Sequence, residues 1–71
     1  METPINAPIA GKIVSVMVKV GDDVKENDQI AIMEAMKMQI PLVSPIKGVV
    51  KDICVTPGQE VEAGTKVAAL E

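Results

Sequence analysis

Residues 7–34 read APIAGKIVSVMVKVGDDVKENDQIAIME, and residues 44–71 read SPIKGVVKDICVTPGQEVEAGTKVAALE. The two stretches align without a gap at an offset of 37, and eight of the 28 aligned pairs are identical. The identical pairs are Pro8/Pro45, Ile9/Ile46, Gly11/Gly48, Val18/Val55, Gly21/Gly58, Val24/Val61, Ala31/Ala68 and Glu34/Glu71. A repeated unit implies two similar substructures. The sequence therefore predicts two halves that are related by a pseudo-twofold axis.

Turn residues divide both repeats at the same places. Val20-Gly21 and Pro57-Gly58 predict type II turns, in which the second central residue needs a positive φ. Asn27 and Gly64, which both tolerate the left-handed conformation, mark the next turn. The apolar runs between these turns predict strands at 4–7, 11–18, 23–25, 29–35, 38–43, 48–55, 60–62 and 66–70.

No segment has a convincing helical period with caps, so the expected fold class is all-β. The expected architecture is a flattened β-barrel or sandwich of two four-stranded antiparallel sheets with pseudo-twofold symmetry. The inward positions should match pair by pair between the repeats. The expected pairs are Val16 with Ile53, Val18 with Val55, Ala31 with Ala68, and Met33 with Leu70.

Composition limits the function classes. A chain of 71 residues is one domain, residues 1–71, which could be the C-terminal domain of a longer chain. It contains no aromatic residue, no histidine and one cysteine, Cys54, so a Cys/His metal site and a His-activated nucleophile are excluded. We interpret Cys54 as a small buried hydrophobe, and Met17 and Met33 as fillers of a core without aromatic side chains.

Charge and hydropathy argue against two classes of partner, nucleic acids and membranes. The net charge is −3, with no dense basic patch and no aromatic platform for bases, which argues against nucleic-acid binding. No apolar run approaches the roughly 18 residues that a membrane span needs. A lone thiol without disulfides suits a reducing compartment, and we expect a cytoplasmic protein.

Residues 35–43, AMKMQIPLV, link the repeats and contain Lys37. If Met36 and Lys37 are the central residues of a tight hairpin, Ala35 pairs with Met38 and Glu34 with Gln39. One face then carries only apolar residues, namely Ala31, Met33, Ala35, Met38, Ile40 and Leu42. A shift of one residue would mix the two faces, so the pattern favours a two-residue turn with Lys37 at its tip. Such a turn normally contains Asn and Gly, and Met-Lys is an unfavourable choice.

The run Glu34-Ala35-Met36-Lys37-Met38 closely resembles the attachment motif of biotinyl domains, the biotin carboxyl carrier domains of the biotin/lipoyl attachment family. The resemblance covers nearly the whole chain. Its other elements are Ala7-Pro8, Gly11, Val20-Gly21-Asp22, Val24, Pro45 and Gly48. Nothing is inserted between Val18 and Val24, where some acetyl-CoA carboxylase carriers have a protruding thumb, so the chain looks like the thumbless type.

The resemblance implies a non-catalytic carrier. Lys37 would be the cofactor-binding residue, acylated with biotin by a biotin–protein ligase. Glu34, Ala35, Met36 and Met38 would form the recognition motif. The loaded domain would carry carboxyl groups between a biotin carboxylase and a carboxyltransferase or decarboxylase. No catalytic residue and no metal ligand are expected.

Three alternatives remain open at this point. A lipoyl domain shares the fold and the hairpin lysine but resembles Asp-Lys-Ala at the turn, whereas Met36 precedes the lysine here. A scaffold or interaction module with unmodified Lys37 is the second alternative. An enzyme is the third, and the absence of a nucleophile–base pair argues against it.

The repeat also predicts where Lys37 lies. At an offset of 37, its symmetry mates would fall just before Met1 and just after Glu71. A twofold axis would therefore carry the Lys37 hairpin to the place where the chain ends are. We expect the hairpin and the two chain ends at opposite ends of the molecule.

Overall fold

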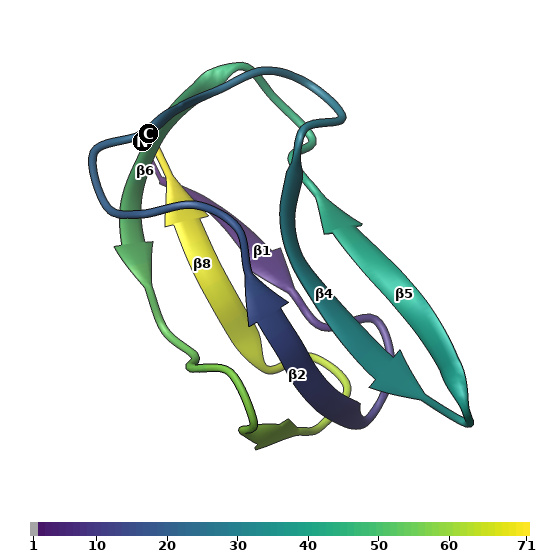
Figure 1. Ribbon diagram of the computed structural model, residues 1–71. Helices are drawn as coiled ribbons and strands as arrows, with labels where there is room; N and C mark the ends of the chain where they lie inside the picture. The colour runs from purple at the N-terminus through teal and green to yellow at the C-terminus, as the bar shows by residue number, and fades with distance from the viewer. Residues whose placement is uncertain (1) are drawn as a thin grey trace.

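Eight short strands make up the computed structural model, which describes residues 2–71 and contains no helix within them (Figure 1). The strands are β1 (Thr3–Asn6), β2 (Gly11–Val16), β3 (Asp23–Val24), β4 (Gln29–Ala35), β5 (Met38–Val43), β6 (Gly48–Ile53), β7 (Glu60–Val61) and β8 (Lys66–Leu70). The all-β prediction is confirmed. Three predicted ranges are matched to the residue, and the other five strands end one or two residues earlier than predicted.

The strands form two four-stranded antiparallel sheets. Their orders are β1-β8-β6-β3 and β5-β4-β2-β7, so β4 and β8 each have a neighbour on both sides. Alternate side chains from both sheets fill the space between them, and Ile13, Ile30, Met33, Val50 and Leu70 are almost fully buried there. The predicted sandwich is confirmed.

The hydrogen-bond register repeats at the predicted offset. Ile13 pairs with Met33 between β2 and β4, and Val50 pairs with Leu70 between β6 and β8. The β2–β4 ladder shifts between Ile13 and Ser15, and the β6–β8 ladder shifts at the equivalent place. The two halves therefore share even their irregularities, as a pseudo-twofold relation requires.

The turns follow the same symmetry. Gly21 and Gly58 have φ values of 96° and 90°, as the second central residue of a type II turn requires. Gly21 N–H donates to the carbonyl of Val50 at 2.8 Å, and Gly58 N–H donates to that of Ile13 at 2.7 Å. These reciprocal bonds attach the turn of each repeat to a central strand of the other.

The predicted core pairs are inward, but to different depths. Ala31, Ala68, Met33 and Leu70 are 0% exposed, and Val55 is buried. Their companions Val16, Val18 and Ile53 are partly buried and pack against the core.

Two predictions about the core were wrong. Met17 is 53% exposed and Cys54 is exposed, so neither fills the core. The two residues occupy the same position in the two repeats. Each follows an inward residue at the end of a strand, and strand alternation directs it outward.

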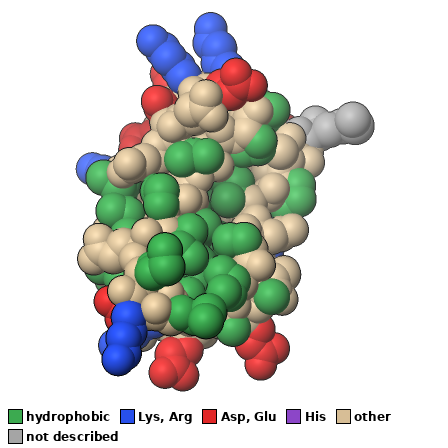
Figure 2. Space-filling model, turned by 90° about the vertical axis from the view of Figure 1, so that its right-hand side faces the viewer, with side chains coloured by type: hydrophobic (Ala, Val, Ile, Leu, Met, Phe, Trp, Pro, Cys, Tyr) green, Lys and Arg blue, Asp and Glu red, His purple; other side chains and the backbone are tan. Residues whose placement is uncertain are grey.

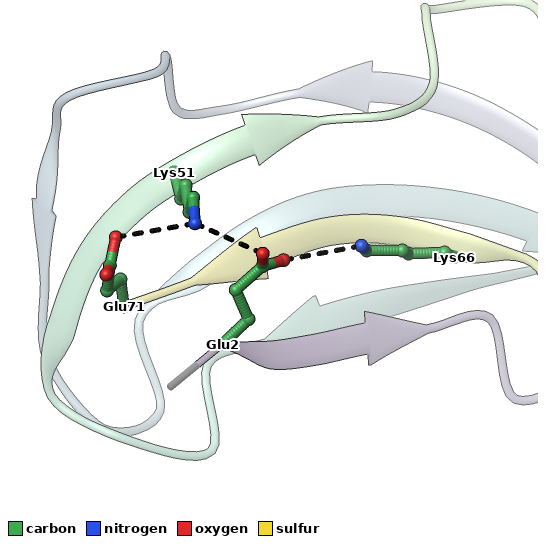
Figure 3. Close-up of polar contacts among 4 residues, drawn as sticks. All are labelled: Glu2, Lys51, Lys66 and Glu71. Atoms are coloured by element: carbon green, nitrogen blue, oxygen red, sulfur yellow. Dashed lines mark hydrogen bonds and ion pairs between the residues drawn. The ribbon is translucent and has the colours of Figure 1, made fainter.

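The start of β1 and the end of β8 lie together, because Thr3 pairs with Leu70. Lys51 bridges Glu2 and Glu71 there, with Nζ to oxygen distances of 3.1 and 3.8 Å, and Lys66 approaches Glu2 at 3.6 Å (Figure 3). The molecule is 31 Å long and 17 Å across. Figure 1 shows the chain ends at the upper left and the β4–β5 turn at the lower right, which confirms the predicted opposite placement.

The ion pairs at this end predict a shifted titration. The hydrogen bond and charge of Lys51 hold the pKa of Glu2 below its usual 4.5, and the same contact raises the pKa of Lys51. Because the pKa of Glu2 is lower in the folded state, its stabilising effect is complete above the unfolded pKa. The effect is lost as the pH falls through the folded pKa. An NMR titration at low salt should give a Glu2 carboxyl midpoint below 4.5, and Lys51→Met should raise it.

The control variant for this titration is Lys19→Met, which removes a lysine outside the Glu2 ion pairs and should leave the Glu2 midpoint unchanged. A wild-type midpoint at or above 4.5 would contradict the arrangement in Figure 3.

Candidate functional site

The β4–β5 hairpin has the predicted register. Ala35 pairs with Met38 and Glu34 with Gln39, which leaves Met36 and Lys37 as the two residues of the turn. Their φ values are 53° and 66°. Two positive φ values are the mark of a type I′ turn, whose twist matches that of the flanking strands. The two-residue turn with Lys37 in it is confirmed.

Lys37 is exposed at the tip of this hairpin. Within residues 2–71, no ion pair or hydrogen bond joins its side chain to another residue. By contrast, Lys51 and Lys66 are held by carboxylates at the other end of the molecule. The Lys37 amine is therefore presented outward on a flexible four-carbon stem.

The two flanking methionines are both exposed, Met36 by 83% and Met38 by 66%. The exposure of Met36 agrees with its predicted place as a central residue of the turn. Met38 pairs with Ala35, as the predicted register requires, but its side chain is exposed and does not join the core. Met38 begins β5, an edge strand with a neighbour only on its β4 side, whereas its pairing partner Ala35 lies on a central strand and is buried. Two large apolar side chains therefore flank Lys37 in solvent.

The remaining motif residues lie at the foot of the turn. Glu34 is exposed and Ala35 is only 5% exposed. A shallow hollow beside them is lined in part by Gly11, Lys12, Met36 and Val61. The sequence marked Gly11 as the start of a strand, as a repeated glycine and as part of the resemblance to biotinyl domains, but not as a neighbour of the hairpin. The structure places it against the hairpin, and its recurrence as Gly48 in the second repeat was the available signal.

Apolar side chains also cover the face beyond the hairpin. Figure 2 shows them gathered over the side on which β5 lies in Figure 1, with most charged side chains at the upper and lower margins. On β5 the exposed apolar residues include Met38, Pro41 and Val43. The hairpin lysine thus stands at one end of a surface suited to protein contact.

The turn conformation predicts a gain of stability on removing a side chain. Met36 has a φ of 53°, a left-handed conformation that glycine adopts without strain. The same conformation costs a non-glycine residue about 1 kcal/mol. We expect Met36→Gly to raise the free energy of unfolding by about 0.5–1 kcal/mol in urea denaturation.

The matched control for this gain is Asn27→Gly. Asn27 has a φ of 74°, but asparagine already tolerates that conformation, so the change should stay within about 0.5 kcal/mol. A destabilised Met36→Gly variant would contradict this account of the turn.

No helix capable of crossing a membrane occurs among residues 2–71.

Sequence comparison places these features among known proteins. A family described as "Biotin-requiring enzyme" matches residues 3–70. The chain is 58% identical over 33 residues to the 2-oxoglutarate carboxylase large subunit of Hydrogenobacter thermophilus, an alignment that covers 46% of this chain and 5% of the relative. It is 57% identical over 35 residues to the glutaconyl-CoA decarboxylase subunit gamma of Acidaminococcus fermentans, covering 49% of this chain and 24% of that subunit.

Solved structures contain the same fold. Urea carboxylase of Kluyveromyces lactis superposes with a TM-score of 0.94 and 30% identity, over 100% of this chain and 6% of that one. A single-chain, multi-domain long-chain acyl-CoA carboxylase superposes with a TM-score of 0.91 and 35% identity. That alignment covers 96% of this chain and 7% of the carboxylase. The chain thus matches one small part of much longer proteins. With a family model that spans nearly all of it and a fold shared with carboxylases, the chain belongs to the Biotin-requiring enzyme family, as one of its non-catalytic biotinyl carrier domains.

Proposed function

We propose that Lys37 is the biotin attachment residue and that the loaded domain carries carboxyl groups between the active sites of a biotin-dependent carboxylase or decarboxylase. The observation that carries the proposal is the position of Lys37. Its amine stands alone at a type I′ turn, at the end of the molecule opposite the chain ends. A segment joined to either chain end would leave this amine free to enter other active sites.

The residues present fit a covalently attached group. In the active site of a biotin–protein ligase, the Lys37 Nζ would attack the carboxyl carbon of biotin after ATP has activated that carboxyl group as a mixed anhydride with phosphate. The new C–N amide bond would form, the C–O bond to the phosphate would break so that the nucleotide phosphate leaves, and the amine would lose a proton. Only the neutral amine is a nucleophile, so the ligase must remove a proton from it before the amide bond forms. Once bound, the biotin ring supplies the carboxyl-transfer chemistry that the side chains of this domain lack.

The neighbouring residues would serve recognition. Met36 and Met38 expose large, flexible apolar side chains on both sides of Lys37, as suits a surface that several partners read in turn. Glu34 adds a carboxylate at the foot of the hairpin, and the buried Ala35 anchors the turn to β4. We infer that the ligase, the biotin carboxylase and the carboxyltransferase or decarboxylase all contact this end.

The location of the carrier follows from its chemistry. Cys54 is exposed as a free thiol, which suits a reducing compartment. We therefore place the carrier and its partners in the cytoplasm.

The intact mass of the chain tests the proposal. The chain is expressed with a biotin–protein ligase and biotin, and we expect a mass increase equal to one biotinyl group. A lipoyl increment obtained with a lipoate ligase, and none with biotin, would indicate the alternative carrier function. An unchanged mass in both cases would leave a scaffold role and refute the proposal.

A further inference from the structure

We propose that Gly11 is a positioning residue for Lys37: by lacking a side chain, it lets β2 lie close against the end of β4 and so sets where the hairpin tip stands. The inference rests on the proposed role of Lys37 as the biotin attachment residue. It concerns a residue that lies outside the recognition motif and 26 positions earlier in the chain.

The contacts of Gly11 show why a side chain does not fit. A Cβ placed there would collide with the carbonyl oxygen of Glu34, and it would lie 2.8 Å from Met33 Cε and 3.1 Å from Ala35 Cβ. The methionine terminus can move aside, but the carbonyl and the alanine Cβ are fixed to the backbone. Three other glycines are needed for their backbone conformation and not for space. Gly21, Gly58 and Gly64 have positive φ and open space around them, whereas Gly11 is required for space.

The contacts around Gly11 indicate whether β2 or β4 would move if a side chain were added there. On the side away from β4, β2 is held by β7, where Gly11 pairs with Val61, and by two hydrogen bonds of Ile13 to the 58–59 turn. Beyond Ala35, the chain has only the two-residue turn and the edge strand β5. A methyl group at Gly11 would therefore displace Glu34 and Ala35, and Lys37 lies two residues further along.

The second repeat supplies a matched control. Gly48 is the symmetry mate of Gly11, and a Cβ there would lie 2.7 Å from the carbonyl oxygen of Glu71. The collision is of the same kind, with a backbone oxygen of the equivalent glutamate. It occurs beside the chain ends, at the opposite end of the molecule from the hairpin (Figure 1). Gly48→Ala therefore strains the fold at one close contact, with a backbone oxygen, where Gly11→Ala has three, and it should leave Lys37 in place.

The experiment compares Gly11→Ala with Gly48→Ala. Initial rates of biotinylation by a biotin–protein ligase are measured on folded protein at several carrier concentrations. We expect Gly11→Ala to lower kcat by about tenfold to a hundredfold, because small misplacements of a reacting group have effects of that size. We expect Gly48→Ala to change kcat by less than about twofold. A purely structural role would lower the free energy of unfolding of the Gly11→Ala variant without changing kcat for the fraction of protein that is folded.

A second measurement does not depend on biotin. NMR spectra of the unloaded domain should show amide shifts at Ala35, Met36 and Met38 in Gly11→Ala and unchanged hairpin signals in Gly48→Ala. Equal kcat values for the two folded variants would overturn the inference. So would a Gly11→Ala chain that does not fold, because the glycine would then serve the whole fold. If wild-type protein is not labelled, the proposed function fails, and the hairpin shifts still show whether Gly11 positions the turn.

Discussion

Replacing Lys37 with arginine is expected to abolish biotinylation while leaving the fold intact. A guanidinium does not deprotonate in proteins and cannot be acylated as an amine can, but it keeps the positive charge and the length of the side chain. Lys37 is exposed at a turn and has no partner within residues 2–71, so the free energy of unfolding should change by no more than about 0.5 kcal/mol. The loss of labelling should be complete, because the proposal assigns the modification to one of the seven lysines.

Peptide mapping after digestion of the labelled wild-type chain measures this directly. All biotin should be found on Lys37, and acylation should change the net charge from −3 to −4 in an isoelectric separation. The matched control is Lys12→Arg, an exposed lysine on β2 near the same hairpin, which should be labelled normally. Biotin on Lys12, or residual labelling of Lys37→Arg, would falsify the assignment.

The fold could be predicted from the sequence because residues typical of turns occur at the same positions in both repeats. Gly21 and Gly58 need positive φ at the same position of both repeats, and the apolar runs between the turns have strand length. The hairpin register was predictable for a different reason. Strand side chains alternate with a period of two, so a register shift of one residue would separate Ala31, Met33 and Ala35 from Ile40 and Leu42.

The two wrong predictions about the core came from the assumption that a hydrophobic residue is a buried one. Met17 and Cys54 align in the two repeats, and both looked like core residues because both are hydrophobic. Yet Val16 and Val18 already pack against the core on either side of Met17, so alternation leaves Met17 outside, and the same holds for Cys54. The exposure of Met38 could not be decided from the hairpin register, because Met38 is the first residue of an edge strand, and strand order cannot be read from a local pattern.

The candidate site was predictable in position but not in chemistry. The pattern placed Lys37 at a hairpin tip, and the structure agrees. An exposed lysine is common on protein surfaces, and nothing in its spacing specifies biotin. The attachment chemistry rests on the resemblance of the five-residue motif to biotinyl domains. The recurrence of Gly11 as Gly48 marked the position, but the close approach of Gly11 to the hairpin depends on how β2 and β4 lie beside each other, which the sequence alone does not give.

Truncating either of the symmetry mates Met33 and Leu70 should produce the largest losses of stability. Both side chains are 0% exposed, and both lie on the central strands, β4 and β8. Replacing a buried Leu or Met by alanine removes apolar burial and leaves a cavity, at a cost of about 2–5 kcal/mol. A domain of 71 residues has a total stability of roughly 4–10 kcal/mol. Each substitution should therefore remove a large fraction of the total.

The position of Leu70 makes this test informative. It is the penultimate residue, and the ends of most domains tolerate change, but here Leu70 pairs with both Thr3 and Val50 in the middle of a sheet. Urea denaturation should show Leu70→Ala losing about as much free energy of unfolding as Met33→Ala, its mate in the other repeat. The control is Met17→Ala, which removes a 53% exposed methionine and should cost within about 0.5 kcal/mol. If Leu70→Ala proves as mild as Met17→Ala, the chain end does not complete the core, and the pseudo-twofold packing of β4 and β8 is wrong.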